Sequence, residues 1–444
     1  MTIEQPPAVD DAPLPGALSS TKAPRKKVVA WAFWDWGTQP FATVITTFVF
    51  SVYLTSSAFG DKDEVTIKLA WATGTAGLLI ALLAPVLGQG ADRTGKRMFH
   101  LRWQTWLLAA ICAAMYFVAP APEYFLLGAV LLGAGNVVSE IANVNYYSAL
   151  DQVSTPSDVG RVSGLGWGLG YLNGITILLV IIAVLGSDFT PDDVRLSMLI
   201  CGAWTLLFTI PIFIALKDRR PDHVPPSLGI VGSYRELFRS IRRVGRDNPN
   251  TLFFLVASAL FRDGLAGVFT FGGVLAAGTF GFTFGEVVIF GVVANVVAGL
   301  ATMLFGLLDD RLGPKRVILF SLGMLVALGL GIFYFHDGGK TVFWIFGLGM
   351  TLFVGPAQSA SRSFLTRLIP EGMSGEMFGL YATTGRAVSF LAPLMFGLMI
   401  TVGVAVTGDA QESSQHWGIL GVVLVLLAGF IVALFVKQPQ RAVA

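Results

Sequence analysis

Five ionisable side chains lie in apolar stretches long enough to cross a membrane: Asp35, Glu140, Arg262, Asp263 and Arg386. A charged group at bilayer depth is costly, so such groups usually serve a substrate pathway or a proton relay. Arg keeps its proton in proteins, so two of the three carboxylates can each neutralise one Arg. The third then lacks a partner, and a buried carboxylate without a partner takes up a proton readily. We therefore predict proton coupling at Asp35 or Glu140, with the other groups as structural or substrate-binding partners.

Polar side chains repeat at helical spacing around these charges. A polar stripe within lipid must face water or the interior of a helix bundle, so the pattern predicts a polar cavity. The expected lining is Asp35, Gln39, Asn136, Glu140, Asn143, Tyr147, Arg262, Asp263, Gln358 and Arg386. The alternative is a static network of ion pairs among the five charged groups.

The composition indicates a membrane protein. The chain has 444 residues, of which 54% are hydrophobic and 13% charged, whereas a soluble domain has about 45–50% and about 25%. So few charges exclude a soluble enzyme, a disordered chain and a nucleic-acid-binding module. Cys112 and Cys201 lie in apolar runs and are expected to be packing residues. The sequence has no His spacing typical of a metal site and no phosphate-binding loop, so we expect no metal, no cofactor and no use of ATP.

Twelve apolar segments are long enough to be transmembrane helices. They cover 28–55, 66–88, 101–119, 124–149, 162–186, 194–216, 251–279, 284–308, 317–335, 341–366, 378–406 and 417–436. Runs of this length form helices because lipid cannot satisfy backbone polar groups. We expect Pro40 to kink the first helix and Gly355-Pro356 to weaken the tenth.

The longest connection, 217–250, divides these helices into six plus six. The expected fold is an all-α membrane protein with twelve transmembrane helices in two six-helix bundles, 28–216 and 251–436. A disordered cytoplasmic tail (1–27), a basic cytoplasmic linker (217–250) and a cytoplasmic tail (437–444) complete the chain. Within the linker, arginines surround Leu237, Phe238, Ile241 and Val244. This pattern predicts either a basic amphipathic helix on the anionic inner leaflet or a linker that only sets topology.

Lys and Arg residues orient the chain. Of 30 such residues, only Lys62, Lys68, Arg195 and Lys340 fall in loops on one side, and the positive-inside rule assigns the other side to the cytoplasm. Arg362 and Arg367 are counted with that cytoplasmic side. Both termini are therefore expected in the cytoplasm.

A motif of the form G-x-x-x-D-R-x-G-x-[KR] occurs at equivalent places in the two halves, which indicates an internal duplication. Its copies comprise Gly88, Asp92, Arg93, Gly95, Lys96 and Arg97, and Gly306, Asp310, Arg311, Gly313, Lys315 and Arg316. The first Gly permits close helix contact and the second a tight turn, while the Asp can cap a helix and pair with a cation. We predict a conformational latch. The alternative is a set of basic residues that only determines topology.

The paired loops in a six-plus-six chain resemble the signature loop of the major facilitator superfamily. A narrower resemblance is to its vacuole-effluxer branch, carried by WAFWDWGTQPFA at 31–42, GRVSGLGWGLGY at 160–171, RDG at 262–264 and QSASRS at 358–363. Gly37-Thr38-Gln39 and Arg262 depart from the branch pattern. The resemblance implies secondary transport, a cavity lined by spans 1, 4, 7 and 10, and, for fungal members, amino-acid export from the vacuole.

We therefore expect a carrier that works by alternating access and exports a small polar metabolite, such as an amino acid, in exchange for protons. The expected partners are that substrate, membrane lipids and protons, with no nucleic acid, and a monomer in the cell (inner) membrane. One alternative is an exporter of drugs or lipophilic compounds, suggested by Trp31, Trp34, Trp36, Phe41 and Trp167. An alternative of another class is a membrane enzyme or scaffold, for which the sequence contains no catalytic acid/His or Ser/His set.

Overall fold

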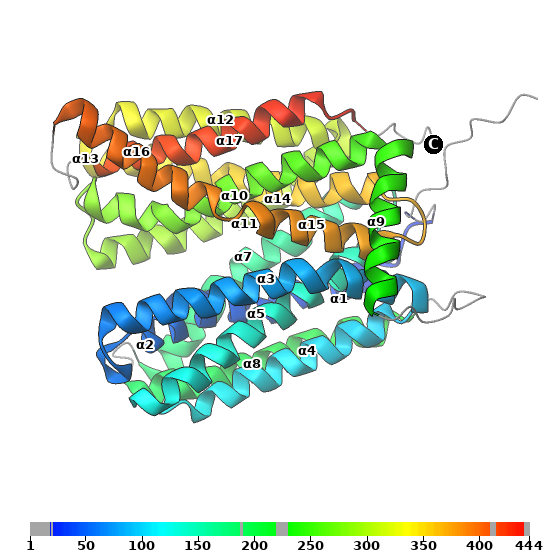
Figure 1. Cartoon of the computed structure of the whole chain (residues 1–444), viewed down its shortest axis with the longest axis horizontal. Helices are drawn as coiled ribbons and strands as arrows, with labels where there is room; N and C mark the ends of the chain where they lie inside the picture. Colours follow the sequence, from blue (N-terminus) through cyan, green and yellow to red (C-terminus); the bar gives the residue numbers. More distant parts are fainter. Residues whose placement is uncertain (1–17, 19–20, 187–189, 219–229, 409–413, 439–444) are drawn as a thin grey trace, which may run out of the picture.

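The computed structural model describes residues 18, 21–186, 190–218, 230–408 and 414–438. Its long helices form two bundles that lie side by side (Figure 1). The first bundle contains α1 (Arg25–Pro40), a π-helix (Phe41–Phe48), α2 (Phe50–Leu54), α3 (Lys62–Thr94), α4 (Arg97–Ala114), α5 (Phe125–Ser148), α6 (Leu150–Val153), α7 (Val159–Leu185) and α8 (Pro191–Ala215). The second contains α10 (Pro249–Gly278), α11 (Phe284–Leu312), α12 (Pro314–Tyr334), α13 (Gly339–Val342), a π-helix (Phe343–Gly347), α14 (Leu348–Leu368), α15 (Ser374–Val388), α16 (Leu391–Thr407) and α17 (Gly418–Phe435).

Ten helices among the described residues are long and apolar enough to cross a membrane. The two remaining predicted spans are helical but shorter or more polar. The first is divided after Pro40, where α1 gives way to the π-helix, because proline lacks the N–H that an α-helix needs. The other, α4, has 18 residues and carries Arg97, His100 and Arg102 in its first two turns. The arrangement is that of an all-α membrane protein and is consistent with twelve spans.

Two predicted spans have a different shape from the one expected. The segment 378–406 is not one helix, because α15 ends at Val388 and α16 begins at Leu391. Conversely, α14 runs unbroken through Gly355 and Pro356, so the expected weakening does not interrupt the helix. A Cβ on Gly355 would overlap Oγ1 of Thr302 on α11 and lie 3.1 Å from Cε2 of Tyr171 on α7, so this glycine permits α11 and α7 to pack closely against α14.

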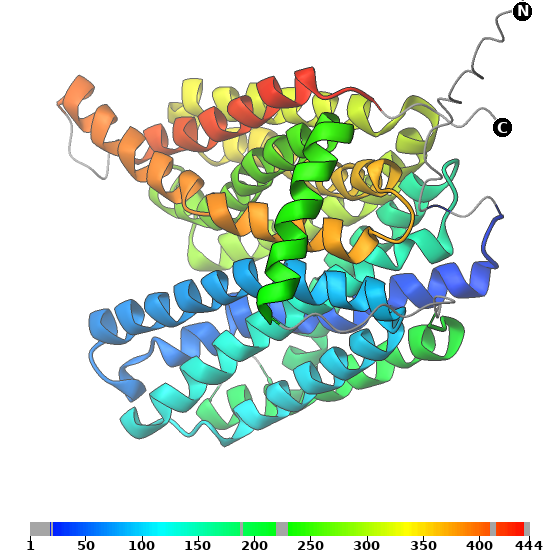
Figure 2. The ribbon, with the colours of Figure 1, turned by 45° about the vertical axis from the view of Figure 1, so that its right-hand side comes forward.

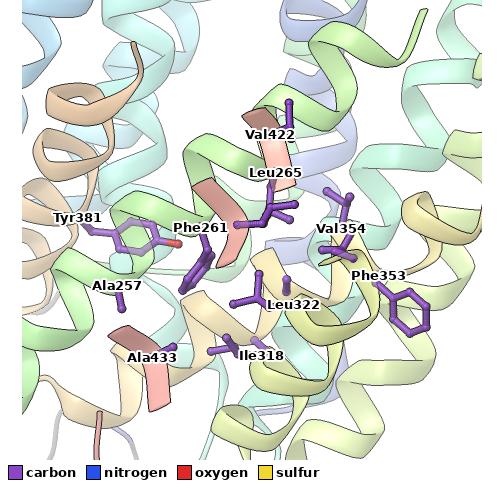
Figure 3. Close-up of a cluster of buried hydrophobic side chains, with 14 of the residues drawn as sticks. Ala257, Phe261, Leu265, Ile318, Leu322, Phe353, Val354, Tyr381, Val422 and Ala433 are labelled. Carbon is purple, nitrogen blue, oxygen red and sulfur yellow. The ribbon is translucent and has the colours of Figure 1, made fainter. Parts of the chain in front are cut away.

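The core of the second bundle consists of interlocking apolar side chains from α10, α12, α14 and α17 (Figure 3). Phe261 and Leu265 of α10 are fully buried there, together with Leu322 of α12 and Val354 of α14. Helices in lipid associate through close packing and hydrogen bonds, since the lipid tails are as apolar as the side chains. This rigid packing lets the bundle hold polar groups at fixed positions on its inner face.

The bundles contact each other mainly at one end, where α3 packs along α15 and α7 along α11. We call this the terminal end, because α1 begins and α17 ends there (Figure 1), and the opposite end the far end. Helix α9 (Ile230–Asp247) crosses both bundles near the terminal end (Figures 1 and 2). It belongs to the predicted linker 217–250, of which 219–229 lie outside the described residues. Most of the predicted tails 1–27 and 437–444 also lie outside them, and α1 begins at Arg25, within the first predicted tail.

Candidate functional site

A cavity of about 240 Å³ lies between the two bundles. From the first bundle it is lined by Glu140, Asn143, Val144 and Tyr147 of α5 and Trp167 of α7. From the second it is lined by Arg262, Asp263 and Ala266 of α10, Gln358 and Arg362 of α14, and Phe378, Tyr381, Ala382, Gly385, Arg386 and Ser389 of α15 and its C-terminal cap. Three guanidinium groups and two carboxylates therefore lie beside aromatic rings in a cavity between the two bundles.

Seven of the ten residues predicted for the cavity line it: Glu140, Asn143, Tyr147, Arg262, Asp263, Gln358 and Arg386. Asp35, Gln39 and Asn136 do not. The amide of Asn136 donates to the Leu132 carbonyl of its own helix at 3.0 Å, and the amide of Gln39 donates to Thr43 Oγ1 at 3.2 Å. Helical spacing identifies the face of a helix but not how far along it a cavity extends.

Arg362 was predicted to lie with the basic residues of the cytoplasmic side, but its side chain is buried between the bundles. It is only 1% exposed, and its Nη1 lies 3.6 Å from Oδ2 of Asp35. Its Nε and Nη2 donate to the side chain and the carbonyl of Ser163 at 3.0 and 2.6 Å. The guanidinium also lies over the rings of Trp31 and Tyr147, 5.0 and 4.9 Å from their centroids. Asp35 therefore has a cation partner, and the charge count of three acids against two Arg was incomplete.

The second ion pair crosses the cavity. Nη2 of Arg386 on α15 lies 3.1 Å from Oε1 of Glu140 on α5, so the pair joins the two bundles. Its side chains are 35% and 32% exposed, unlike the enclosed Asp35–Arg362 pair. Water or a polar ligand entering the cavity can therefore reach both charges.

Arg262 and Asp263 do not pair with each other, because adjacent residues on a helix point to different sides. Arg262 lies over the Tyr381 ring, 3.6 Å from its centroid, and donates to the Tyr381 carbonyl at 2.8 Å. Asp263 accepts the backbone N–H of Ala392 at 2.7 Å, at the start of α16. No Lys, Arg or His that the structure describes has a side-chain nitrogen within 4.0 Å of this carboxylate. Asp263 thus faces a helix N-terminus, whose partial positive charge favours an anion.

The repeated motif lies at the terminal end, and each motif Asp reaches a helix of the other bundle. Asp92 accepts the N–H of Glu376 in the first turn of α15 at 2.9 Å and pairs with Arg97 at 2.9 Å. Asp310 accepts the N–H groups of Gly160 and Arg161 in the first turn of α7 at 2.7 and 2.9 Å. Because the two motifs arise from an internal duplication, the contact of Asp92 in one half corresponds to the contact of Asp310 in the other.

Beside these two contacts, α3 crosses α15 and α11 crosses α7, and glycines lie where the helices cross. A Cβ on Gly88 would overlap the Gly375 carbonyl oxygen, and one on Gly306 would lie 2.8 Å from the Gly160 carbonyl oxygen. Gly95 and Gly313 follow with φ of 62° and 91°, which glycine adopts without strain. Of the other motif residues, Lys315 donates to the Leu434 carbonyl at 2.8 Å, Arg93 is partly buried, and Lys96, Arg311 and Arg316 are exposed.

Further ion pairs at the terminal end were not predicted. Arg97 also lies 3.0 Å from Asp151, which accepts a hydrogen bond from Ser374 of α15 at 2.9 Å. Arg367 lies 2.6 Å from Asp309 and 3.1 Å from Asp310. The adjacent carboxylates of Asp309 and Asp310 in the second motif are the sequence feature that indicates an ion-pair cluster here. The partners come from other helices, however, so the sequence alone does not pair them.

Two helix bundles around a central polar cavity define the architecture of a major facilitator superfamily transporter. The structure is similar to that of the human organic anion transporter MFSD10 (TETRAN), with a TM-score of 0.70 and 15% identity over 93% of this chain and 100% of that one. It is also similar to a bacterial homologue of the iron transporter ferroportin in its outward-facing state, with a TM-score of 0.67 and 15% identity over 92% and 98% of the two chains. FucP in the outward conformation gives a TM-score of 0.67 at 16% identity over 93% and 99%.

Residues 151–442 match the family model described as "Vacuole effluxer Atg22 like", and the chain belongs to this family. The uncharacterized MFS-type transporter YxiO of Bacillus subtilis is 24% identical over 93% of this chain and 95% of its own length. Autophagy-related protein 22 of Yarrowia lipolytica is 24% identical over 61% of this chain and 51% of its own length. The match thus spans about half of that fungal protein. The chain is an integral membrane protein and a secondary transporter, not an enzyme.

Proposed function

We propose that this transporter exports a small zwitterionic metabolite, such as an amino acid, by alternating access and in exchange for protons. The observation that carries the proposal is the mixed charge of the cavity. Arg386 and Arg262 can hold a carboxylate, while Glu140 and Asp263 can hold an ammonium group, and charge-assisted hydrogen bonds of this kind are strong. The family description as an effluxer supports the outward direction.

Arg362 offers a further donor for the substrate carboxylate. Its Nη1 is buried without a hydrogen-bond partner among the described residues, and the side chain lines the cavity. Oδ2 of Asp35 lies 3.6 Å from this nitrogen, which is too long for a hydrogen bond, and a buried donor without a hydrogen bond is costly. A carboxylate placed between Arg362 and Arg386 would satisfy this donor.

The size of the cavity favours a small metabolite over a lipophilic drug. Its volume of about 240 Å³ is below the range of about 300–1,000 Å³ typical of pockets for drug-sized ligands. The aromatic residues that suggested drug export serve mainly in packing. The rings of Trp31 and Trp34 stack on Tyr146 at 4.4 and 4.3 Å, and of that group only Trp167 lines the cavity.

Proton coupling is proposed at Glu140 in preference to Asp35. Glu140 is open to the cavity and its partner Arg386 belongs to the other bundle, whereas Arg362 and Tyr146 enclose Asp35. Exchange requires the substrate and the proton to use Glu140 alternately. The substrate ammonium group binds the ionised Glu140 carboxylate and displaces its proton, and a proton that returns to Glu140 removes the charge that holds the substrate. Both termini are proposed to be cytoplasmic, so the closed terminal end corresponds to a carrier open to the outside.

Counterflow of labelled amino acids in proteoliposomes tests the proposal. With wild-type protein, counterflow should occur, and an imposed pH gradient should drive net transport. Glu140→Gln should retain counterflow but lose the response to the gradient. Glu64→Gln is the matched control, because Glu64 is exposed and, among the described residues, forms an ion pair only with Lys68 one turn away. An unchanged gradient response in Glu140→Gln would reject the coupling site, and wild-type protein without counterflow of any amino acid would reject the substrate class.

A further inference from the structure

Helix α9 carries five arginines, and the structure places most of this positive charge on its outer surface. They are Arg235, Arg239, Arg242, Arg243 and Arg246, and all are exposed. Glu236 lies 3.2 and 3.9 Å from Arg239 and Arg243. Arg235 and Arg242 form no ion pair or hydrogen bond with any residue that the structure describes. A positive surface of this kind suits an anionic partner.

An exposed apolar edge lies beside these arginines. Val231 and Phe238 are 75% and 69% exposed, and their spacing of seven residues places them on one side of the helix. Arg235 and Arg242 have the same spacing and form the adjacent side. A helix with an arginine row next to exposed apolar side chains is typical of helices that lie in the membrane interface.

The opposite face of α9 is held against both bundles. Leu237 and Val244 are 5% and 7% exposed, and the Tyr234 hydroxyl donates to the Leu82 carbonyl of α3 at 2.9 Å. At the other end, α9 leads into α10 and packs against it. Figures 1 and 2 show that α9 runs across the spanning helices. Its axis is therefore close to the membrane plane, and its outer face is directed away from the bundles.

We propose that α9 binds the headgroups of anionic phospholipids, with Arg235 and Arg242 on the phosphates and Phe238 among the upper parts of the acyl chains. The planar guanidinium binds phosphate oxygens through two parallel hydrogen bonds. Each basic residue near an anionic membrane surface changes the affinity about fivefold. The pair should therefore contribute about 25-fold. The site is independent of the transported substrate and of the side of the membrane that the terminal end faces.

The test uses the full-length protein in detergent, titrated with phosphatidylglycerol or phosphatidylcholine. Bound lipids are counted by native mass spectrometry, and thermal unfolding is followed in parallel. Wild-type protein should prefer phosphatidylglycerol, and Arg235→Gln/Arg242→Gln should weaken its binding about 25-fold. Lys26→Gln/Lys27→Gln removes the same charge from exposed residues at the terminal end and should retain the preference.

Equal phosphatidylglycerol binding by the double Gln variant and wild type would overturn the proposal. So would inorganic phosphate or a soluble acidic peptide that reproduces the thermal shift without lipid, because the partner would then not be a membrane. If the Gln variant does not fold, salt provides the test on wild-type protein. A headgroup site loses its preference for phosphatidylglycerol as salt rises, and a salt-independent preference would contradict it.

Discussion

Replacing Gly88 with Ala should favour opening of the terminal end. Gly88 lies where α3 crosses α15, and a Cβ there would overlap the Gly375 carbonyl oxygen and lie 2.7 Å from the Gly375 carbonyl carbon. No rotamer change relieves a contact with backbone, so the two helices must separate. Overpacking costs about 1–3 kcal/mol, and a cost of this size changes a two-state equilibrium about 5- to 150-fold. The closed state should lose population by that factor.

Gly90→Ala is the matched control. Gly90 lies in the same helix, two residues further on, and a Cβ there meets no atom within 4 Å. Both substitutions replace a helical glycine with alanine and so gain about the same helix propensity, about 1 kcal/mol. Any difference between the two variants therefore reports the crossing of α3 and α15.

Distances between spin labels measure the effect. Cysteines at Ser157 and Glu371 would label exposed positions of opposite bundles at the terminal end, and cysteines at Glu123 and Thr341 would label the far end. The native Cys112 and Cys201 are buried and would be replaced with Ala. Gly88→Ala should lengthen the terminal distance and shorten the far one, while Gly90→Ala should match wild type. Identical distance distributions in the two variants would refute the reasoning.

Two further predictions concern buried charges. Arg362→Met leaves Asp35 buried without its cation, so it should destabilise the protein by about 3–5 kcal/mol, measured by unfolding in detergent. Adding Asp35→Asn should recover much of this loss, and a double variant as unstable as the single one would count against the pair. Asp263→Leu removes the acceptor of the Ala392 N–H and should cost about 1–3 kcal/mol, whereas Asp263→Asn keeps an acceptor and should cost less. Equal loss in both variants would mean that the cap contributes nothing.

The spans and the crossing points could be predicted from the sequence because both depend on local patterns. An apolar run of about 20 residues marks a helix in lipid whatever its neighbours are. The repeated motif similarly marked Asp92 and Asp310, since a Gly, an Asp and a basic residue at fixed spacing suit a helix crossing with a cap. The same local patterns identified Glu140 and Arg386 as charges at membrane depth.

The break between α15 and α16 was not predicted, because 378–406 is apolar enough on average to count as one span, although Ser389 and Pro393 lie beside the break. The start of α16 depends on the Asp263 carboxylate, which comes from α10. The burial of Arg362 likewise depends on Asp35 of α1 and Ser163 of α7. A charge near the end of an apolar run looks the same in sequence whether it lies in a loop or in a pocket formed by other helices.

Each copy of the motif contacts a helix of the opposite bundle, and this arrangement affects how the terminal end opens. Asp92 of the first bundle caps α15 of the second, and Asp310 of the second caps α7 of the first. Each cap lies beside a close approach of two glycines, Gly88 to Gly375 and Gly306 to Gly160. Moving the bundles apart by an ångström would break both caps and leave the carboxylates without their N–H donors. Since packed interfaces switch between discrete arrangements and do not deform continuously, we expect the two contacts to open together, and weakening either one should therefore shift the same equilibrium.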